Sequence, residues 1–263
     1  MAKTPQEIAR DFSENGYVSG IELLSPSEAS VFRDHVLQLL DAFGEERDVV
    51  RNVANYLSWG YDLASRPFLV DILEALIGPE ILLLGSMLLI KPAGSASVVL
   101  WHADGEFQSH PGTNHVAAWL ALNPSHRRNG CVKVVEGSHR QKHLHHEVVS
   151  PNNQIFKALT LVEEPDPEKV RYLELEPGQF SMHNQAIVHG SDANGSDTMR
   201  IGLILRYGTP EGSDLSEPFI QVRGNTDLRD AQLPPSRFEG TDEERIPALI
   251  AYNREIEAQL SVQ

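Results

Sequence analysis

The chain has 263 residues, of which 41 % are hydrophobic and 22 % charged, a composition typical of a globular protein with a sizeable core. Its net charge of −15 disfavours nucleic acid and anionic membranes as partners, because both repel an acidic protein. The single cysteine, Cys131, excludes an intramolecular disulfide framework and a cysteine-rich metal site. A metal site would therefore need other ligands, and the 11 histidines are the feature to follow.

The N-terminus lacks an apolar run of the signal-peptide type, and no stretch approaches the roughly 18 apolar residues of a membrane span. We therefore expect a cytoplasmic protein that has no membrane partner.

Helix-start signals recur in the first 80 residues. Thr4-Pro5-Gln6-Glu7 and Ser25-Pro26-Ser27-Glu28 each combine an N-capping residue, a proline at the first helical position and a glutamate at the third. They predict two helices, the first of which ends at Gly16, and we expect a third, short helix from Pro67 to Leu76. The sequence thus predicts N-terminal helices over residues 1–80.

From Ile81 onward the sequence changes to short β-like runs separated by turn residues, a spacing typical of a β-sandwich or barrel. The predicted strands are Ile81–Ile90, Val98–His102, His115–Leu122, Val132–Val135, Val170–Leu175, Gln179–Met182 and Ile201–Tyr207. Residues 209–240 are rich in turn residues and are expected to be irregular, and a C-terminal helix is expected to start near Thr241. The predicted fold is mainly β, a single domain over 1–263 with a β-core at about 81–208 and flanking helices.

Two residues near the end of the second predicted strand have the spacing of a metal clip. His102 and Asp104 are two apart, so their side chains project from the same face of a strand. A third ligand is needed, and the segment that follows Phe180 offers His183 and His189.

The residues after His189 favour it over His183. Asn194-Gly195 is a strong signal for a two-residue type I′ hairpin, which would place His189 opposite Arg200 on the adjacent strand. Two histidines and one carboxylate form the facial triad of non-haem Fe(II) oxygenases, which leaves metal positions open. A nearby arginine can hold the far carboxylate of 2-oxoglutarate, and the Ser191 hydroxyl can add a hydrogen bond.

The sequence resembles the phytanoyl-CoA dioxygenase-like family of Fe(II)- and 2-oxoglutarate-dependent oxygenases over about residues 5 to 207. The motifs that carry the resemblance appear in order: Lys91-Pro92, Trp101-His102-Ala103-Asp104, Trp119-Leu120-Ala121-Leu122, Asn129-Gly130-Cys131-Val132, Val135-Glu136-Gly137-Ser138-His139, Glu176-Pro177-Gly178-Gln179, His189-Gly190-Ser191, Asn194, Arg200 and Arg206-Tyr207. Each motif is degenerate by itself, and their ordered set is specific.

The resemblance implies the roles of individual residues. His102, Asp104 and His189 would be the catalytic iron ligands, and Arg200 would bind 2-oxoglutarate. Three further residues, Lys91, Trp119 and Ser191, would help to line the pocket for this co-substrate. The implied fold is a double-stranded β-helix, a cupin-like jelly roll, in agreement with the predicted strands.

The implied reaction oxidises a small molecule, with hydroxylation of an unactivated C–H bond as the expected outcome. O₂ is the second co-substrate, and 2-oxoglutarate is converted to succinate and CO₂. Halogenating relatives lose the carboxylate ligand, so the presence of Asp104 favours oxygenation.

Two alternatives share the predicted fold. One is a catalytically silent jelly-roll protein that binds a metal or ligand, although such a protein has no physical reason to keep the triad together with Arg200. The other is a cupin-type metal enzyme that does not use 2-oxoglutarate, which leaves Arg200 unexplained.

Other candidates have less specific signals. His183 is interpreted as a pocket residue rather than a ligand, and the histidines between His139 and His146 as a solvated loop. Glu106 to His110, with Trp59 and Tyr61, would line the pocket mouth or simply pack in loop and core. Arg206 is six residues beyond Arg200, so it lies on the same strand face and can meet an anionic substrate group.

Overall fold

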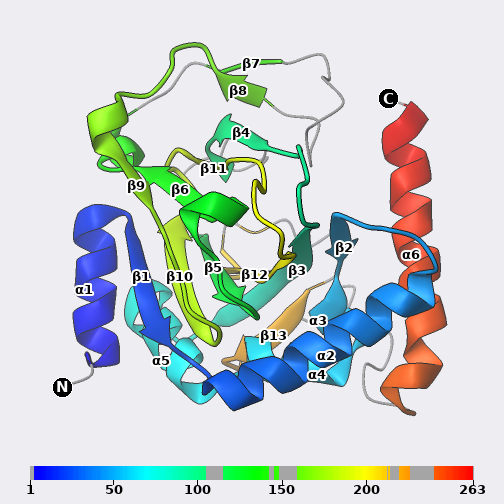
Figure 1. The fold of residues 1–263 in the computed structure, drawn as a ribbon. Helices are drawn as coiled ribbons and strands as arrows, with labels where there is room; N and C mark the ends of the chain where they lie inside the picture. The colour runs from blue at the N-terminus through cyan, green and yellow to red at the C-terminus, as the bar shows by residue number, and fades with distance from the viewer. Residues whose placement is uncertain are drawn as a thin grey trace.

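In the computed structural model, helices surround two antiparallel sheets that form the body of the molecule (Figure 1). The structure describes residues 3–104, 115–141, 145–147, 159–211, 213, 219–225 and 240–262. Within them the larger sheet has seven strands and the smaller has four, and both belong to the mainly antiparallel, helix-flanked fold that the sequence predicts.

The larger sheet has the order β1-β10-β5-β12-β3-β13, and β2 also pairs with β3. Its strands are β1 (Tyr17–Glu22), β2 (Val49–Arg51), β3 (Ile81–Lys91), β5 (Val116–Ala121), β10 (Gln179–Asn184), β12 (Arg200–Gly208) and β13 (Ile220–Arg223). The smaller sheet has the order β4-β11-β6-β9. Its strands are β4 (Val99–His102), β6 (Val132–Val135), β9 (Val170–Tyr172) and β11 (His189–Ser191). A separate pair consists of β7 (His145–Glu147) and β8 (Leu159–Leu161).

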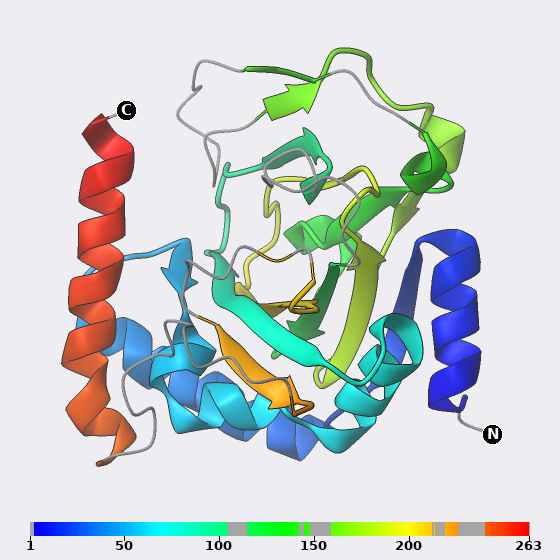
Figure 2. The same cartoon turned by 180° about the vertical axis from the view of Figure 1, so that it is seen from behind.

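Helices cover the outer face of the larger sheet, and α6 runs beside β2 at one edge of the molecule (Figures 1 and 2). They are α1 (Pro5–Asn15), α2 (Pro26–Phe43), α3 (Val53–Tyr56), α4 (Ser58–Ala64), α5 (Pro67–Ile77) and α6 (Asp242–Val262). The predicted capping boxes form at Thr4 and Ser25, where each hydroxyl accepts a hydrogen bond from the backbone N–H of the following glutamate. α1 ends at Asn15, and Gly16, the predicted end, caps it in the left-handed conformation that glycine adopts readily.

The central strands β3, β5, β10 and β12 of the larger sheet are buried on both faces, which explains why they appear in the sequence as nearly continuous apolar runs. Along β12 the side chains alternate. Ile201, Leu203, Leu205 and Tyr207 join the core beneath the helices. Arg200, Ile204 and Arg206 line a pocket together with residues of the smaller sheet. The functional side chains therefore face the space between the two sheets.

Three strands of the larger sheet escaped prediction. β1 and β2 lie within the segment expected to contain helices, and β13 lies within 209–240, which was expected to be irregular. β1 is a six-residue strand interrupted by Gly20 at φ 73° and by a register shift, and β2 and β13 have only three and four residues. Strands this short carry little periodicity, and their positions depend on pairing with β10 and β3.

The predicted hairpin around Asn194-Gly195 is wrong. β11 pairs with β4 and β6, whereas β12 pairs with β3 and β5, so His189 and Arg200 lie on different sheets. The buried Asn194 side chain explains why the chain passes from one sheet to the other here. Its Nδ2 donates to the carbonyl oxygens of Lys91, Pro92 and Thr198 at 3.0, 2.8 and 2.8 Å, so the asparagine fixes the crossing segment instead of a turn.

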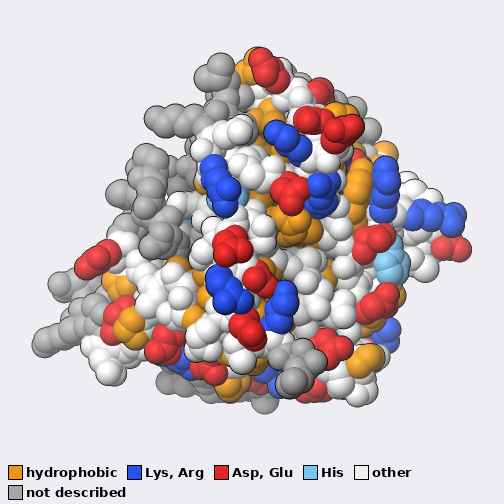
Figure 3. Space-filling model, turned by 90° about the vertical axis from the view of Figure 1, so that its left-hand side faces the viewer, with side chains coloured by type: hydrophobic (Ala, Val, Ile, Leu, Met, Phe, Trp, Pro, Cys, Tyr) orange, Lys and Arg blue, Asp and Glu red, His pale blue; other side chains and the backbone are white. Residues whose placement is uncertain are grey.

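The surface seen in Figure 3 carries Lys and Arg side chains interspersed with Asp and Glu. Ion pairs form between exposed side chains of opposite charge, such as Arg171 and Glu136, whose Nη2 and Oε2 atoms are 2.6 Å apart. In the part of the chain that the structure describes, no helix is both long enough and apolar enough to span a membrane.

Candidate metal centre and pocket

Two neighbouring strands of the smaller sheet bring the predicted metal ligands together. His102 ends β4 and is the register partner of His189 on β11, and Asp104 follows two residues after His102. The Asp104 Oδ1 atom lies 3.6 Å from Nε2 of His102 and 3.9 Å from Nε2 of His189. One ligand atom from each of these buried residues lies within 4.8 Å of the others, a spacing suited to a single metal ion.

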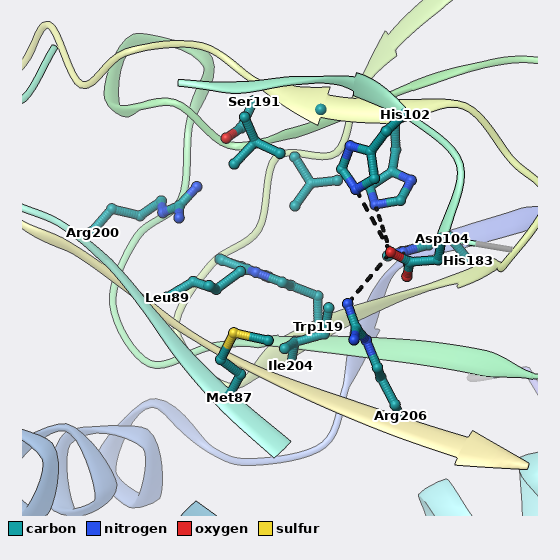
Figure 4. A pocket seen from close by; sticks show the side chains of 14 residues that line it. Met87, Leu89, His102, Asp104, Trp119, His183, Ser191, Arg200, Ile204 and Arg206 are labelled. Atoms are coloured by element: carbon teal, nitrogen blue, oxygen red, sulfur yellow. Dashed lines mark hydrogen bonds and ion pairs between the residues drawn. The ribbon is translucent and has the colours of Figure 1, made fainter. Parts of the chain in front are cut away.

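Backbone carbonyls orient both imidazole rings. The Nδ1 atom of His102 lies 2.8 Å from the carbonyl oxygen of Leu100, and Nδ1 of His189 lies 3.1 Å from that of Ile187. A histidine whose Nδ1–H donates to a carbonyl keeps the Nε2 lone pair available for a metal. Each ring therefore presents Nε2 to the same point, beside the Asp104 carboxylate (Figure 4).

The charge states of these groups suit metal binding. Burial, reinforced by His102 and His183, lowers the pKa of His189 well below its ordinary value, so its imidazole is neutral. Burial by itself would raise the pKa of Asp104, but the neighbouring Arg206, His102 and His183 outweigh it and hold the pKa well below its ordinary value. The site thus offers a neutral imidazole at His189 and an ionised carboxylate at Asp104.

His183 of β10 lies against this centre from the larger sheet. Its ring centroid is 4.4 Å from that of His189, and its Nε2 atom is 3.9 Å from Oδ2 of Asp104. It is not part of the three-residue ligand group, and neither of its ring nitrogens has a hydrogen-bond partner among the described residues. This position agrees with the interpretation of His183 as a pocket residue.

A buried cation occupies the opposite end of the same pocket. Arg200 of β12 is 1 % exposed and donates from Nη1 to the carbonyl oxygen of Gly130. Its guanidinium carbon lies 5.2 Å from the centroid of the Trp119 ring. Burial lowers the pKa of Arg200 to about 10, which still leaves the side chain charged at neutral pH. Figure 4 shows Arg200 and Ser191 on one side of the pocket and the metal ligands on the other.

Three buried polar atoms at this end have no hydrogen-bond partner among the described residues. They are Nε of Arg200, Oγ of Ser191 and Nε1 of Trp119. Buried polar groups are nearly always satisfied, so unpaired donors around a cation indicate the place of an anionic ligand. The residues present therefore fit a molecule that meets a metal at one end and offers a carboxylate at the other, as 2-oxoglutarate does.

The other residues predicted to line this pocket differ in position. Trp119 of β5 and Ser191 of β11 line it, but Lys91 is not among the lining residues. The Lys91 ammonium is fully buried at the end of β3, opposite Arg200 in register, and donates to the carbonyl oxygen of Asp192. Burial, and then repulsion by Arg200, lower the pKa of Lys91 to about 7.

Sequence reasoning missed Gly202, which makes room for the Trp119 ring. A Cβ atom at Gly202 would lie 2.0 Å from Cζ2 of Trp119, so any other residue would displace the indole from its place beside Arg200. A glycine inside a strand pattern, between Arg200 and Ile204, was the available signal.

Arg206 lies on the same face as Arg200, as its spacing predicts, with Nη2 3.4 Å from Oδ1 of Asp104. Trp59 instead packs in the helix-covered core, stacked on His35 at a centroid distance of 6.0 Å, and Tyr61 packs against that core too. The segment Glu106–His110 and His143 lie outside the described residues.

Two facing antiparallel sheets with a His-Asp-His group between them define a cupin-like jelly-roll protein with a candidate metal centre. The model of the phytanoyl-CoA dioxygenase family matches residues 12–202, and the chain belongs to this family.

Individual relatives are distant. The chain is 27 % identical over 174 residues to a probable phytanoyl-CoA dioxygenase of Caenorhabditis elegans, a match that covers 63 % of this chain and 54 % of the relative. It is 25 % identical over 222 residues to a probable alpha-ketoglutarate-dependent hypophosphite dioxygenase of Stutzerimonas stutzeri, which covers 76 % of this chain and 77 % of that protein. The chain thus spans about half the length of the phytanoyl-CoA dioxygenases it matches.

Among solved structures, the apo form of the non-haem monooxygenase ThoJ is similar, with a TM-score of 0.75 and 23 % identity. The match covers 94 % of this chain and 99 % of ThoJ, and it supports the fold assignment over nearly the whole chain.

Proposed function

We propose that the chain is a non-haem Fe(II)- and 2-oxoglutarate-dependent dioxygenase that hydroxylates an unactivated C–H bond of a small molecule. The observation that carries the proposal is the arrangement of one pocket, in which the three donors His102, Asp104 and His189 face the buried cation Arg200. A metal enzyme that does not use 2-oxoglutarate would have no use for a buried guanidinium with an unpaired Nε atom.

In this proposal each end of the pocket binds one part of the co-substrate complex. His102, Asp104 and His189 hold iron(II), which when bound supplies O₂ activation coupled to oxidation of 2-oxoglutarate to succinate and CO₂. Arg200 binds the far carboxylate of 2-oxoglutarate, and Ser191 donates a hydrogen bond to it. The indole N–H of Trp119 provides a further donor at that end.

Apolar side chains between the two ends keep the pocket dry. Met87 and Leu89 of β3 and Ile204 of β12 come from the larger sheet, and Val132 of β6 comes from the smaller one. A dry pocket strengthens the attraction between Arg200 and a carboxylate and limits side reactions with water.

Family membership does not identify the substrate. The names of the relatives specify phytanoyl-CoA in one case and hypophosphite in another, two chemically different molecules. We therefore assign only the class of reaction and a small-molecule substrate.

The test is anaerobic addition of Fe(II) and 2-oxoglutarate to the metal-free protein. We expect the weak visible charge-transfer band of the metal chelate, followed by succinate release when air is admitted. Arg200→Ala should raise the 2-oxoglutarate concentration needed for the band, whereas the control Arg171→Ala, at a 44 % exposed surface ion pair, should not. A wild-type protein that shows neither the band nor succinate would refute the proposal.

A further inference from the structure

A second cavity adjoins the metal pocket on the side of α6. Its lining includes Arg51 of β2 and Tyr252 of α6, and it shares Met87, Ile204 and Arg206 with the metal pocket. A molecule in this second cavity would therefore lie next to the metal centre, separated from it only by these shared side chains.

The cavity is cationic although the chain as a whole carries a net charge of −15. None of the described residues that line it is acidic, and two of them, Arg51 and Arg206, are arginines. The Arg51 guanidinium forms no hydrogen bond or ion pair within 4.0 Å among the described residues. Burial lowers the pKa of Arg51, Glu257 opposes this effect, and Arg206 reinforces it, so the two guanidinium groups repel each other. The nearby Glu257 carboxylate pairs with Arg47 instead.

Arg206 faces both cavities. Its Nη2 atom lies 3.4 Å from Oδ1 of Asp104, while its Nε atom is buried and has no hydrogen-bond partner among the described residues. When Asp104 ligates a metal ion, its negative charge is shared with that ion and neutralises Arg206 less. Arg206, whose side chain is 40 % exposed, and Arg51 then present two positive charges to the cavity between them, where an anion would compensate them.

Hydrogen bonds to α6, some 200 residues further along the chain, hold the side of the cavity that carries Arg51. The Asn253 side chain of α6 accepts from the Arg51 backbone N–H at 2.7 Å and donates to its carbonyl oxygen at 3.1 Å. Next to it, Asn52 adopts φ 58°, and its Nδ2 donates to the Tyr252 hydroxyl at 2.7 Å. A left-handed non-glycine residue held in this way is the kind of strained position that accompanies binding sites.

We propose that Arg51 and Arg206 form an anion-binding subsite that holds a carboxylate or phosphonate group of the primary substrate beside the metal centre. This inference rests on the proposed function, and it narrows the substrate class to small molecules with an anionic group. The guanidinium forks bind planar carboxylate and tetrahedral phosphonate oxygens by the same charge-assisted hydrogen bonds.

The experiment is calorimetric titration of the nickel-loaded protein, saturated with 2-oxoglutarate, with methylphosphonate, propionate and the neutral propionamide. We expect saturable binding of one or both anions and at least about tenfold weaker binding of propionamide. Arg51→Gln should weaken anion binding at least about tenfold and Arg51→Lys less, because lysine keeps the charge. The matched control Arg171→Gln removes an arginine of a surface ion pair and should bind as the wild type does.

Preference for phosphonate or for propionate would identify which anionic group the subsite holds, and either result supports the proposal. Equal binding of propionamide, or wild-type affinity in both Arg51→Gln and Arg206→Gln, would overturn it. The same titration of the metal-free protein separates the two claims. Arg51-dependent anion binding there supports the subsite even if the protein releases no succinate, and succinate release without such binding supports the proposed function alone.

Discussion

The two ends of the pocket face each other across a short apolar stretch, yet burial has opposite consequences for them. At the metal end, burial lowers the pKa of His189 well below its ordinary value, so the imidazole is a neutral donor. At the other end Arg200 is fully buried too, but a pKa lowered to about 10 leaves it charged at neutral pH. The same desolvation thus produces one end suited to a cation and one end suited to an anion.

The charged or metal-facing residues of the two ends also come from different sheets, although Ser191 of β11 lies at the Arg200 end. The backbone carbonyls beside β4 and β11 orient the histidines of the metal end, whereas Arg200 comes from the long central strand β12. We therefore expect changes at one end to leave binding at the other largely intact, and the following variants test this independence.

The largest effect is expected from Asp104→Ala, which removes the charged donor of the metal end. The loss should reduce iron retention and lower succinate release by more than about 100-fold, the upper range seen for residues that only support metal ligands. Metal analysis after desalting and a succinate assay measure the two effects. Asp34→Ala, at a carboxylate that is 58 % exposed, is the control. Full succinate release in Asp104→Ala would contradict the ligand assignment.

Arg200→Gln should affect the opposite end. Loss of a buried charged partner costs about 2 to 5 kcal/mol, so the 2-oxoglutarate concentration for half-maximal succinate release should rise by about 100-fold. Arg200→Lys should fall between this variant and the wild type, because an ammonium cannot form the bidentate pair. Iron retention should stay near the wild-type level in both. Loss of iron in Arg200→Gln would show instead that the two ends are coupled.

The residues at both ends were predictable, but their geometry was not. His102, Asp104, His189 and Arg200 follow from the spacing of residues and from a resemblance, and the structure brings all four to one pocket. The inference that placed His189 opposite Arg200 on an adjacent strand was wrong. It interpreted Asn194-Gly195 as the turn of a hairpin between β11 and β12, which do not pair with each other. A turn motif reports local preference, and here the side-chain hydrogen bonds of Asn194 to distant carbonyls override it.

In the rest of the fold, too, local sequence patterns predict local structure but not the contacts between distant segments. Helices with capping signals, such as α1 and α2, begin where the sequence predicts because their caps are local. The strand β2 and the cavity beside it depend on Asn253 and Tyr252, some 200 residues further along the chain. No local pattern near Arg51 reports those contacts, so its place beside the metal pocket appears only in the structure.

A smaller effect, on stability, is expected from Asn194→Ala in the segment that connects the two ends. The change removes the amide that donates to the carbonyl oxygens of Lys91, Pro92 and Thr198, and the hydrogen bond to Lys91 among these is buried. An unsatisfied buried acceptor costs about 1 to 3 kcal/mol, so we expect a loss of about 2 kcal/mol in the free energy of unfolding, measured in urea. The control Asn15→Ala, at an exposed helix end, should change it by less than about 0.5 kcal/mol. Equal losses would refute the role of Asn194.

The last prediction concerns how much positive charge Lys91 places next to Arg200 at a given pH. The pKa of Lys91 is about 7 in the folded protein and about 10.5 as its ordinary value, so between these values the unfolded chain binds a proton that the folded chain does not. Stability contributed by this residue therefore rises with pH across that window and is lower below it.

Lys91→Met removes this titration, so the difference in unfolding free energy, wild type minus variant, should increase from pH 7 to pH 10. Urea unfolding at several pH values measures it. Leu89→Met alters the same strand without a titratable group and should differ from the wild type by a constant amount. If the Lys91→Met difference is constant or decreases with pH, the pKa of Lys91 is not lowered in the folded protein, and its full positive charge lies next to Arg200.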